Sequence, residues 1–515
     1  AKLSMIEFGG SFNYERGSYS FTISGNKGLF GSLIAGKTLQ DLSLPKILYS
    51  GTSRNFATNV MKGLAGYNQY PYMKFAPAAI QNFFDTSRPD YNNEFLVLDV
   101  ANNIVVTGSS PDDWEFGRPS IANSAIAALS GTAAYMDHRT IPFFNYKWII
   151  QKLFQQFGYT ITGEWMDDAN WDDCFMFNNF AIEKYDLTAH TDINREIQPE
   201  RHLPKKAIGT FLRDLQFFFN VKFSFRDGNN VSMDYRKSAL HSTHVMDTTA
   251  ITGHIFTGTL LDYKQKGFTL AFAFDSADNY PGEHIKEIDP KKLVATINRY
   301  ADFSTLVIGR PFEYNDLVYV AAENQYYAYS NGAGVTAWEY YSEKLGPYII
   351  GPGEYRYESG ISPMATYLFY DTNIDKLVNK DMIAAGMPGS YYNKNYKLIE
   401  APFDTRIFYI SKFTKSGVNL PTSFVHNRDR NNNLRKRISL AWYGPEGLYE
   451  TLWKDWLNFL MNTRLVKTTL ALDQKSYGDF NKATKIRIAG THYLPHQATV
   501  SIPLHEEAQV VLYRL

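Results

Sequence analysis

Three stretches of the sequence share one pattern, in which an aromatic-rich amphipathic helix leads directly into a strand. They run from Pro142 to Gly158, from Pro204 to Asn220 and from Pro445 to Asn462. Pro at the start and Gly or Asn at the end are typical of a finite helix. A stripe of apolar side chains at helical spacing has to bury against another element. The sequence therefore predicts three helices that each pack on a sheet.

The predicted apolar faces follow the spacing of three and four residues along each helix. Their members are Tyr146, Ile149, Ile150, Leu153 and Phe157 in the first helix, Ile208, Phe211, Leu212, Leu215 and Phe219 in the second, and Tyr449, Leu452, Trp453, Trp456 and Leu460 in the third. Among these, Leu212, Leu215, Trp453 and Trp456 are expected to be core positions.

Nearly all of the remaining sequence is predicted to be strand and loop. The clearest hairpin joins residues 221–225 to residues 231–235 through Asp227 and Gly228, which tolerate positive φ. A strand at 94–100 is expected to pair with 104–106, and residues 112–119 are expected to form a loop. Further strands are predicted at 18–23, 316–320, 325–329, 347–350 and 406–410, with a terminal meander over 485–513.

At 515 residues the chain is longer than one hydrophobic core usually fills. We expect a β-dominated, multi-domain α+β fold, with barrel- or sandwich-like β domains and a few amphipathic helices on the sheets. The predicted units are an N-terminal β domain (1–140), an α+β domain with two helices and the hairpin (141–240), a β-rich domain with long loops (241–400) and a C-terminal α+β domain (401–515).

Composition argues for an assembly component. Lys plus Arg and Asp plus Glu both number 52, so no global charge favours nucleic acid as a partner. The single cysteine, Cys174, excludes an internal disulfide framework and a cysteine metal cluster. The 36 Tyr residues suit half-buried sheet faces and subunit interfaces. No signal peptide or membrane span is predicted, so a soluble protein made in the cytoplasm is expected.

Residues Gly31 to Thr38 match the phosphate-loop pattern G-x4-G-K-[ST], with Gly36 and Lys37 at the required positions. A strand before the motif and a helix after it are both required, and neither is predicted. We interpret the match as chance, in a turn between two strands, and predict no cofactor. A nucleotide-binding enzyme ranks third among the functions considered.

Two further groups of side chains were weighed as metal sites. Asp167, Asp168, Asp172 and Asp173 are dense enough for calcium, but the glycine and glutamate of an EF-hand loop are absent, which favours a solvated loop. His241, His244 and Asp247 have a ligand-like spacing without a helix pattern to set their geometry, which favours ordinary surface residues. We predict no metal.

The strongest local charge is a basic run whose members are Arg428, Arg430, Arg435, Lys436 and Arg437. It is a candidate contact for phosphate or for an acidic partner surface, and a solvated loop is the alternative. The sequence holds no Gly-x-Ser-x-Gly elbow, no His-Glu-x-x-His and no carboxylate pair placed for glycoside hydrolysis. It therefore favours a protein without catalytic residues.

Three blocks resemble tail proteins from phages of the Bacteroidetes lineage. They are residues 141–165, residues 202–225, and residues 446–456 together with 484–494. The pattern resembles the tail hub or baseplate hub of phages and related injection systems. The resemblance implies a structural virion protein at the tail tip, which forms a homotrimeric ring, joins the tail tube to tip proteins and lets DNA pass. It implies no catalytic residues. The alternative is a receptor- or carbohydrate-binding tail or surface protein that uses exposed Tyr and Trp.

Overall fold

The computed structural model describes most of the chain, with gaps. The described residues are 11–13, 18–20, 26–80, 100–102, 104–116, 140–182, 185–186, 191–192, 195–225, 229–248, 257–274, 278, 290–298, 302, 305–313, 316–321, 325–332, 335–341, 345–367, 382–385, 387, 389–392, 398–415, 417–425, 436–471, 485–499 and 507–515.

Helices are few and short. The α-helices are α1 (Asn26–Ile34), α2 (Ser53–Lys62), α4 (Tyr146–Gln156), α5 (Glu164–Asp167), α6 (Ile208–Phe219), α7 (Ser238–His241), α8 (Tyr263–Lys266) and α10 (Lys454–Asn462). The 3-10 turns are η1 (Leu39–Asp41), η3 (Ala169–Trp171), η4 (Pro199–His202) and η6 (Pro290–Lys292), and η9 (Tyr449–Trp453) is a π-helical turn.

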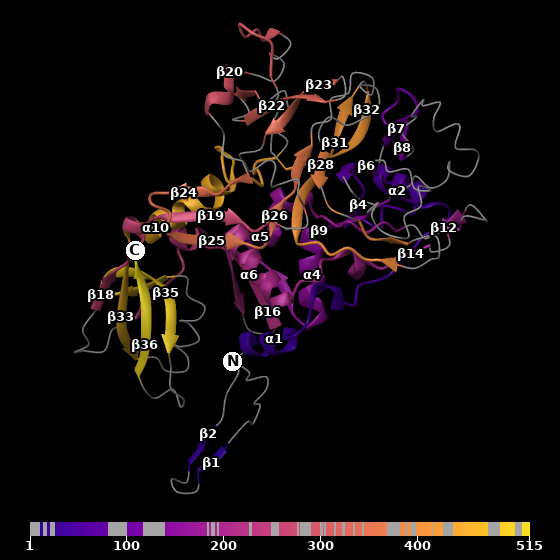
Figure 1. The fold of residues 1–515 in the computed structure, drawn as a ribbon. Helices are drawn as coiled ribbons and strands as arrows, with labels where there is room; N and C mark the ends of the chain where they lie inside the picture. The colour runs from indigo at the N-terminus through magenta and orange to yellow at the C-terminus, as the bar shows by residue number, and fades with distance from the viewer. Residues whose placement is uncertain are drawn as a thin grey trace.

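Two six-stranded sheets dominate the fold (Figure 1). The central sheet has the order β26 (Ser362–Pro363), β31 (Arg406–Lys415), β11 (Cys174–Met176), β9 (Phe143–Asn145), β4 (Met73–Lys74), and β32 (Val418–Phe424) also pairs with β31. The C-terminal sheet has the order β17 (Val245–Thr248), β34 (Lys485–Ile488), β35 (Thr491–Thr499), β36 (Glu507–Arg514), β33 (Arg464–Ala471), β18 (Thr257–Leu260).

Smaller sheets complete the architecture. They are β10 (Thr160–Thr162), β16 (Asn230–Tyr235), β15 (Val221–Phe225); β24 (Tyr348–Ile350), β19 (Phe268–Phe272), β25 (Tyr355–Ser359); β20 (Leu293–Ile297), β21 (Leu317–Val320), β22 (Gln325–Gly332), β23 (Val335–Tyr341); and β27 (Ala365–Tyr367), β28 (Met382–Ala385), β5 (Ala78–Ile80), β6 (Val100–Ala101). Five two-stranded pairs are β1 (Ser11–Asn13) with β2 (Ser18–Ser20), β3 (Ile47–Leu48) with β14 (Glu196–Ile197), β7 (Ile104–Val106) with β8 (Trp114–Phe116), β12 (Tyr185–Asp186) with β13 (Thr191–Asp192), and β29 (Tyr391–Tyr392) with β30 (Leu398–Ile399).

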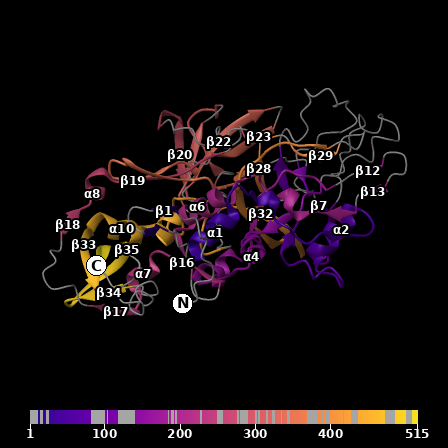
Figure 2. The ribbon, with the colours of Figure 1, turned by 90° about the horizontal axis from the view of Figure 1, so that it is seen from below.

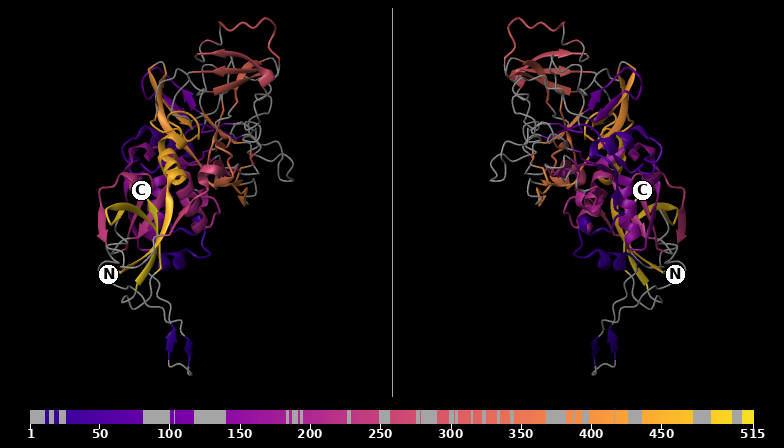
Figure 3. Two further views of the ribbon diagram at one scale, coloured as in Figure 1. Left: turned by 90° about the vertical axis from the view of Figure 1, so that its left-hand side faces the viewer. Right: turned by 90° about the vertical axis from the view of Figure 1, so that its right-hand side faces the viewer.

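The predicted fold class is confirmed: the protein is a β-dominated, multi-domain α+β fold with few helices. The C-terminal sheet lies at one end of the molecule and α2 at the other (Figures 1 and 2). The β20–β23 sheet projects from the body in both side views (Figure 3). One large hydrophobic core runs from Phe30 to Leu460, and a small separate core lies in the C-terminal sheet.

The central sheet combines strands from all four predicted domains. Its strand β4 lies in the first, β9 and β11 in the second, β26 in the third, and β31 and β32 in the fourth. The predicted boundaries near residues 140, 240 and 400 therefore do not separate the sheets.

All three predicted helices are present, but each begins later than predicted. The segment after Pro142 is strand β9, and α4 begins only after that strand. The Asn145 side chain caps α4 by accepting a hydrogen bond from the Trp148 N–H at 3.1 Å. The segment after Pro204 instead approaches Lys37, whose carbonyl accepts from the Ile208 N–H at 2.9 Å. The predicted starts at proline were wrong, since the residues after Pro142 and Pro204 form backbone hydrogen bonds with distant segments of the chain.

The predicted pairing of the hairpin strands is confirmed, with Val221 opposite Tyr235 and Phe225 opposite Val231, while Asp227 and Gly228 of the predicted turn lie outside the described residues. In the described residues β6 pairs with β5 and β7 pairs with β8, and the predicted pairing of 94–100 with 104–106 stays a prediction. Strand β8 also replaces part of the loop predicted at 112–119, while residues 94–99 lie outside the described residues. Long-range partners decide these strands, and local patterns do not report them.

Candidate functional site

The phosphate-loop match lies at the wrong end of a helix. Gly31 is inside α1, and Gly36, with φ of 71°, follows the end of that helix. A phosphate loop needs the helix to begin after the lysine, so that free N–H groups face the phosphate. Here the Lys37 ammonium lies 5.4 Å from the Phe157 ring centroid, and the Thr38 hydroxyl donates to Asp41 at 2.8 Å. The predicted turn between two strands was therefore wrong, and the absence of nucleotide binding stays a prediction.

Two residues of the acidic run, Asp172 and Asp173, form ion pairs with lysines from other parts of the chain. Within the run predicted as a solvated loop, Asp167 ends α5 and Asp168 and Asp172 flank η3, while the side chains of Asp167 and Asp172 are exposed as expected. The Lys147 ammonium donates to Asp172 Oδ1 at 2.6 Å and to the Asp168 carbonyl at 2.8 Å. Burial raises the pKa of Tyr235, whose hydroxyl donates to Asp168 Oδ2 at 2.6 Å. These carboxylates are used in holding α4, η3 and β16 together.

Asp173 lies between two further lysines. Its Oδ1 is 2.9 Å from the Lys74 ammonium and its Oδ2 is 2.8 Å from that of Lys436. Burial alone would raise the pKa of Asp173, but the two lysines outweigh burial and lower it. β4 and β11 both pair with β9 in one sheet, and the long Lys74 side chain spans the distance to Asp173, with its ammonium 5.3 Å from the Phe175 ring centroid.

The basic run is only partly within the described residues. Arg428, Arg430 and Arg435 lie outside them. The Lys436 ammonium is bound to Asp173 and lies 5.9 Å from the Tyr409 ring centroid, whereas Arg437 is exposed. Lys436 is thus an internal ion-pair partner, and the predicted partner contact of the other residues stays a prediction.

The histidine motif does not gather its members into one site. His241 ends α7, and Asp247 lies in β17, directly opposite Arg487 of β34. Two guanidinium nitrogens of Arg487, Nε and Nη2, donate to the Asp247 carboxylate, Nη2 at 2.7 Å, and these hydrogen bonds lower the pKa of Asp247. In the described part of the chain, no group of three His, Cys, Asp or Glu side chains is placed to hold a metal.

A groove of about 380 Å³ lies beside the Lys74–Asp173 ion pair. We call it the Lys74–Asp173 groove, and the residues that define it are Met61, Tyr67, Tyr70, Lys74, Asp173 and Lys412. The elements that contribute lining residues are α2, β4 and β31. The volume is within the range of small-molecule sites.

Two tyrosines of the groove, Tyr67 and Tyr70, pack against the ring of Phe56. The ring centroids of Tyr67 and Tyr70 lie 5.8 and 5.7 Å from that of Phe56, which is fully buried. Both tyrosines are half-buried. Each ring is therefore held in place while part of it stays accessible from the groove.

This groove is not among the sites predicted from the sequence. A signal is present in residues 66–74, where Tyr67, Tyr70 and Tyr72 cluster before Lys74. Nothing in that run points to Asp173 or Lys412, which lie far along the chain and arrive through sheet pairing.

Comparisons with protein-family models, with curated proteins and with solved structures find no match to this chain. No helix in the described part of the chain is both long and apolar enough to cross a lipid bilayer.

Proposed function

We propose that the protein is a structural tail hub, a subunit of a homotrimeric ring at the tip of a phage tail. In this role it joins the tail tube to tip proteins and leaves a channel through which DNA passes. The proposal extends the resemblance of residues 141–165, 202–225, 446–456 and 484–494 to hub proteins, and it assigns no catalytic or cofactor-binding residue.

The observation that carries the proposal is that three of the resembling segments, 141–165, 202–225 and 446–456, share one hydrophobic core. Tyr146 of α4 contacts α6, with its ring centroid 5.8 Å from that of Phe211. The Asn220 side chain, at the end of α6, donates to the Leu452 carbonyl of η9 at 2.8 Å. The likeness therefore belongs to a contiguous structural core and not to three unrelated helices.

The sheet edges suit a closed ring. β17 and β18 border the C-terminal sheet, β20 and β23 border the projecting sheet, and in the described residues no strand pairs with their outer sides. Unpaired edges offer N–H and C=O groups to a neighbouring chain. A cyclic head-to-tail ring needs two different surfaces on each subunit, and these two sheets lie in different parts of the molecule (Figure 3).

Mass photometry of the purified protein, followed by electron microscopy, tests the proposal. We expect a species of three times 58.8 kDa and a closed ring in the images. A species of 58.8 kDa alone at micromolar concentration, with no ring in assembled particles, would contradict the hub.

The charge of the channel is a separate expectation. DNA has to slide without binding, so the wall of the channel should be neutral to acidic, with Arg430 and Arg437 outside it or facing a partner. A reconstruction of the ring in which these arginines line the channel would refute this charge argument and leave the hub proposal standing.

A further inference from the structure

The Lys74–Asp173 groove carries more positive than negative charge. Lys74 and Lys412 line it, and Asp173 is its one acidic lining residue in the described part of the chain. The Asp173 carboxylate already engages Lys74 and Lys436 through separate oxygens. It therefore does not neutralise Lys412 as well.

Lys412 is the cation of the groove that is available to a ligand. It is exposed, and its ammonium has no ion-pair partner among the described residues. Its backbone is held in the long β31–β32 ladder, opposite Pro421. The backbone of Lys412 is therefore fixed, and only the end of its side chain can move to contact an anion in the groove.

Aromatic and hydrogen-bonding groups lie beside this charge. Tyr67 and Tyr70 are half-buried and lie against Phe56 at interplanar angles of 59° and 65°, so part of each ring is accessible. Asn68 and Ser411 also line the groove and add an amide and a hydroxyl. A sugar ring needs this combination, because its C–H face packs on an aromatic ring while its hydroxyl groups require hydrogen-bond partners.

We propose that the Lys74–Asp173 groove binds an acidic saccharide, a sugar unit that carries a carboxylate. The carboxylate lies at Lys412, and the sugar ring packs on Tyr67 or Tyr70. The volume of about 380 Å³ suits one or two sugar units. This site goes beyond the hub function and does not depend on it, because every residue of the groove belongs to one chain.

Isothermal titration of the full chain with glucuronic acid tests the site, with glucose as the neutral counterpart. We expect glucuronic acid to bind about tenfold or more tightly than glucose, with the difference shrinking at high salt. A glucuronate-containing disaccharide shows whether the natural ligand is a free sugar or a sugar unit within a glycan. Tighter binding of the disaccharide than of glucuronic acid is expected only if the ligand is part of a glycan.

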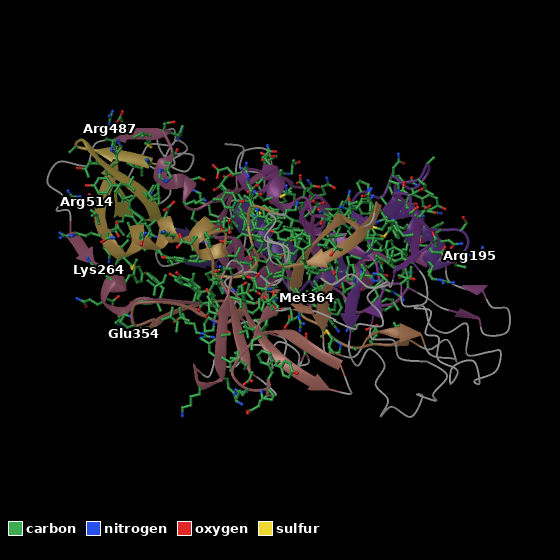
Figure 4. All side chains as sticks on the ribbon, turned by 90° about the horizontal axis from the view of Figure 1, so that it is seen from above. Arg195, Lys264, Glu354, Met364, Arg487 and Arg514 are labelled. Carbon is green, nitrogen blue, oxygen red and sulfur yellow. The ribbon has the colours of Figure 1, made fainter. Side chains whose placement is uncertain are left out.

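The matched variants are Lys412→Ala, Lys412→Arg and Lys264→Ala. Lys264 is exposed on α8, and α8 and α2 lie at opposite ends of the molecule (Figures 2 and 4). We expect Lys412→Ala to abolish the preference for glucuronic acid, Lys412→Arg to keep it, and Lys264→Ala to leave it unchanged. Unchanged melting temperatures would show that the variants remain folded.

Four results would overturn the inference. They are no binding of glucuronic acid at millimolar concentration, equal affinity for glucuronic acid and acetate, unchanged binding by Lys412→Ala, and tighter binding of a tetraglutamate peptide than of glucuronic acid. The last result would assign the groove to an acidic polypeptide. None of them depends on whether the chain forms a ring.

Discussion

The side-chain amide of Asn220 donates a hydrogen bond to the backbone carbonyl of Leu452 at 2.8 Å, across 232 residues of chain. Asn220 also ends α6, in the left-handed conformation with φ of 51° and ψ of 48°. One fully buried residue thus terminates the second predicted helix and ties it to the third.

Two substitutions separate these roles of Asn220. Asn220→Gly keeps the left-handed conformation and loses only the hydrogen bond, which should cost about 1–3 kcal/mol of unfolding free energy because the Leu452 carbonyl is left buried. Asn220→Ala should cost about 1–2 kcal/mol more, since alanine is strained at positive φ. Urea denaturation measures both. Equal costs for the two variants would show that the backbone conformation is not part of the effect.

Trp453 and Trp456 should differ in their contribution to stability, although the sequence predicts both as core. Trp453 is 3% exposed, whereas Trp456 is half-buried and packs on Phe459 and Tyr513 at the surface of α10. We expect Trp453→Ala to cost about 3–5 kcal/mol and Trp456→Ala about 1–2 kcal/mol. Urea denaturation with tryptophan fluorescence gives both values. A larger loss for Trp456→Ala would contradict the packing described for η9 and α10.

His202 should make stability depend on pH. Its ring is buried beside Phe144 and Phe180, and burial, with a smaller effect of Arg201, lowers its pKa to about 3. An unfolded histidine has a pKa near 6.5, so between these values the unfolded state binds more protons and stability falls as pH falls. The expected slope is about 1.4 kcal/mol per pH unit from this residue.

The variant His202→Phe should remove this slope between about pH 6.5 and 4.5, because phenylalanine does not titrate. Asp173 loses its contribution only at lower pH, since its two lysine partners lower its pKa below the ordinary aspartate value. His241→Gln, at an exposed position, is the control and should keep the wild-type slope. Identical slopes in all three proteins would refute the assignment to His202.

The proposed ring predicts a complementation between two surface variants. Val307 and Leu48 are 88% and 69% exposed, the largest fractions among the large apolar side chains described. If they lie in the two different surfaces of a head-to-tail interface, Leu48→Lys and Val307→Lys should each reduce the trimer. Mixing the two variants should give dimers, since one intact interface forms between unlike subunits. Mass photometry measures this, with Lys264→Ala as the control. Trimers in both variants would exclude these residues from the interface.

The sequence by itself determined the elements whose signal is local. The apolar periodicity of α4, α6 and α10, the left-handed Asn220 after α6, and the alternation in β15 and β16 are set within a few residues of chain. The three helices and the hairpin could therefore be predicted. The fold class could also be predicted, since it follows from the number and spacing of such segments.

Only the tertiary structure decided which segments pair and which charges meet. The segment after Pro142 became strand β9 because β4 and β11 flank it, and Lys74, Asp173 and Lys436 converge from three distant parts of the chain. Hydrogen bonds between strands and ion pairs between side chains depend on distance in space, and spacing along the chain does not encode that distance. For this reason the Lys74–Asp173 groove could not be predicted from the sequence, although its two tyrosines are close together along the chain.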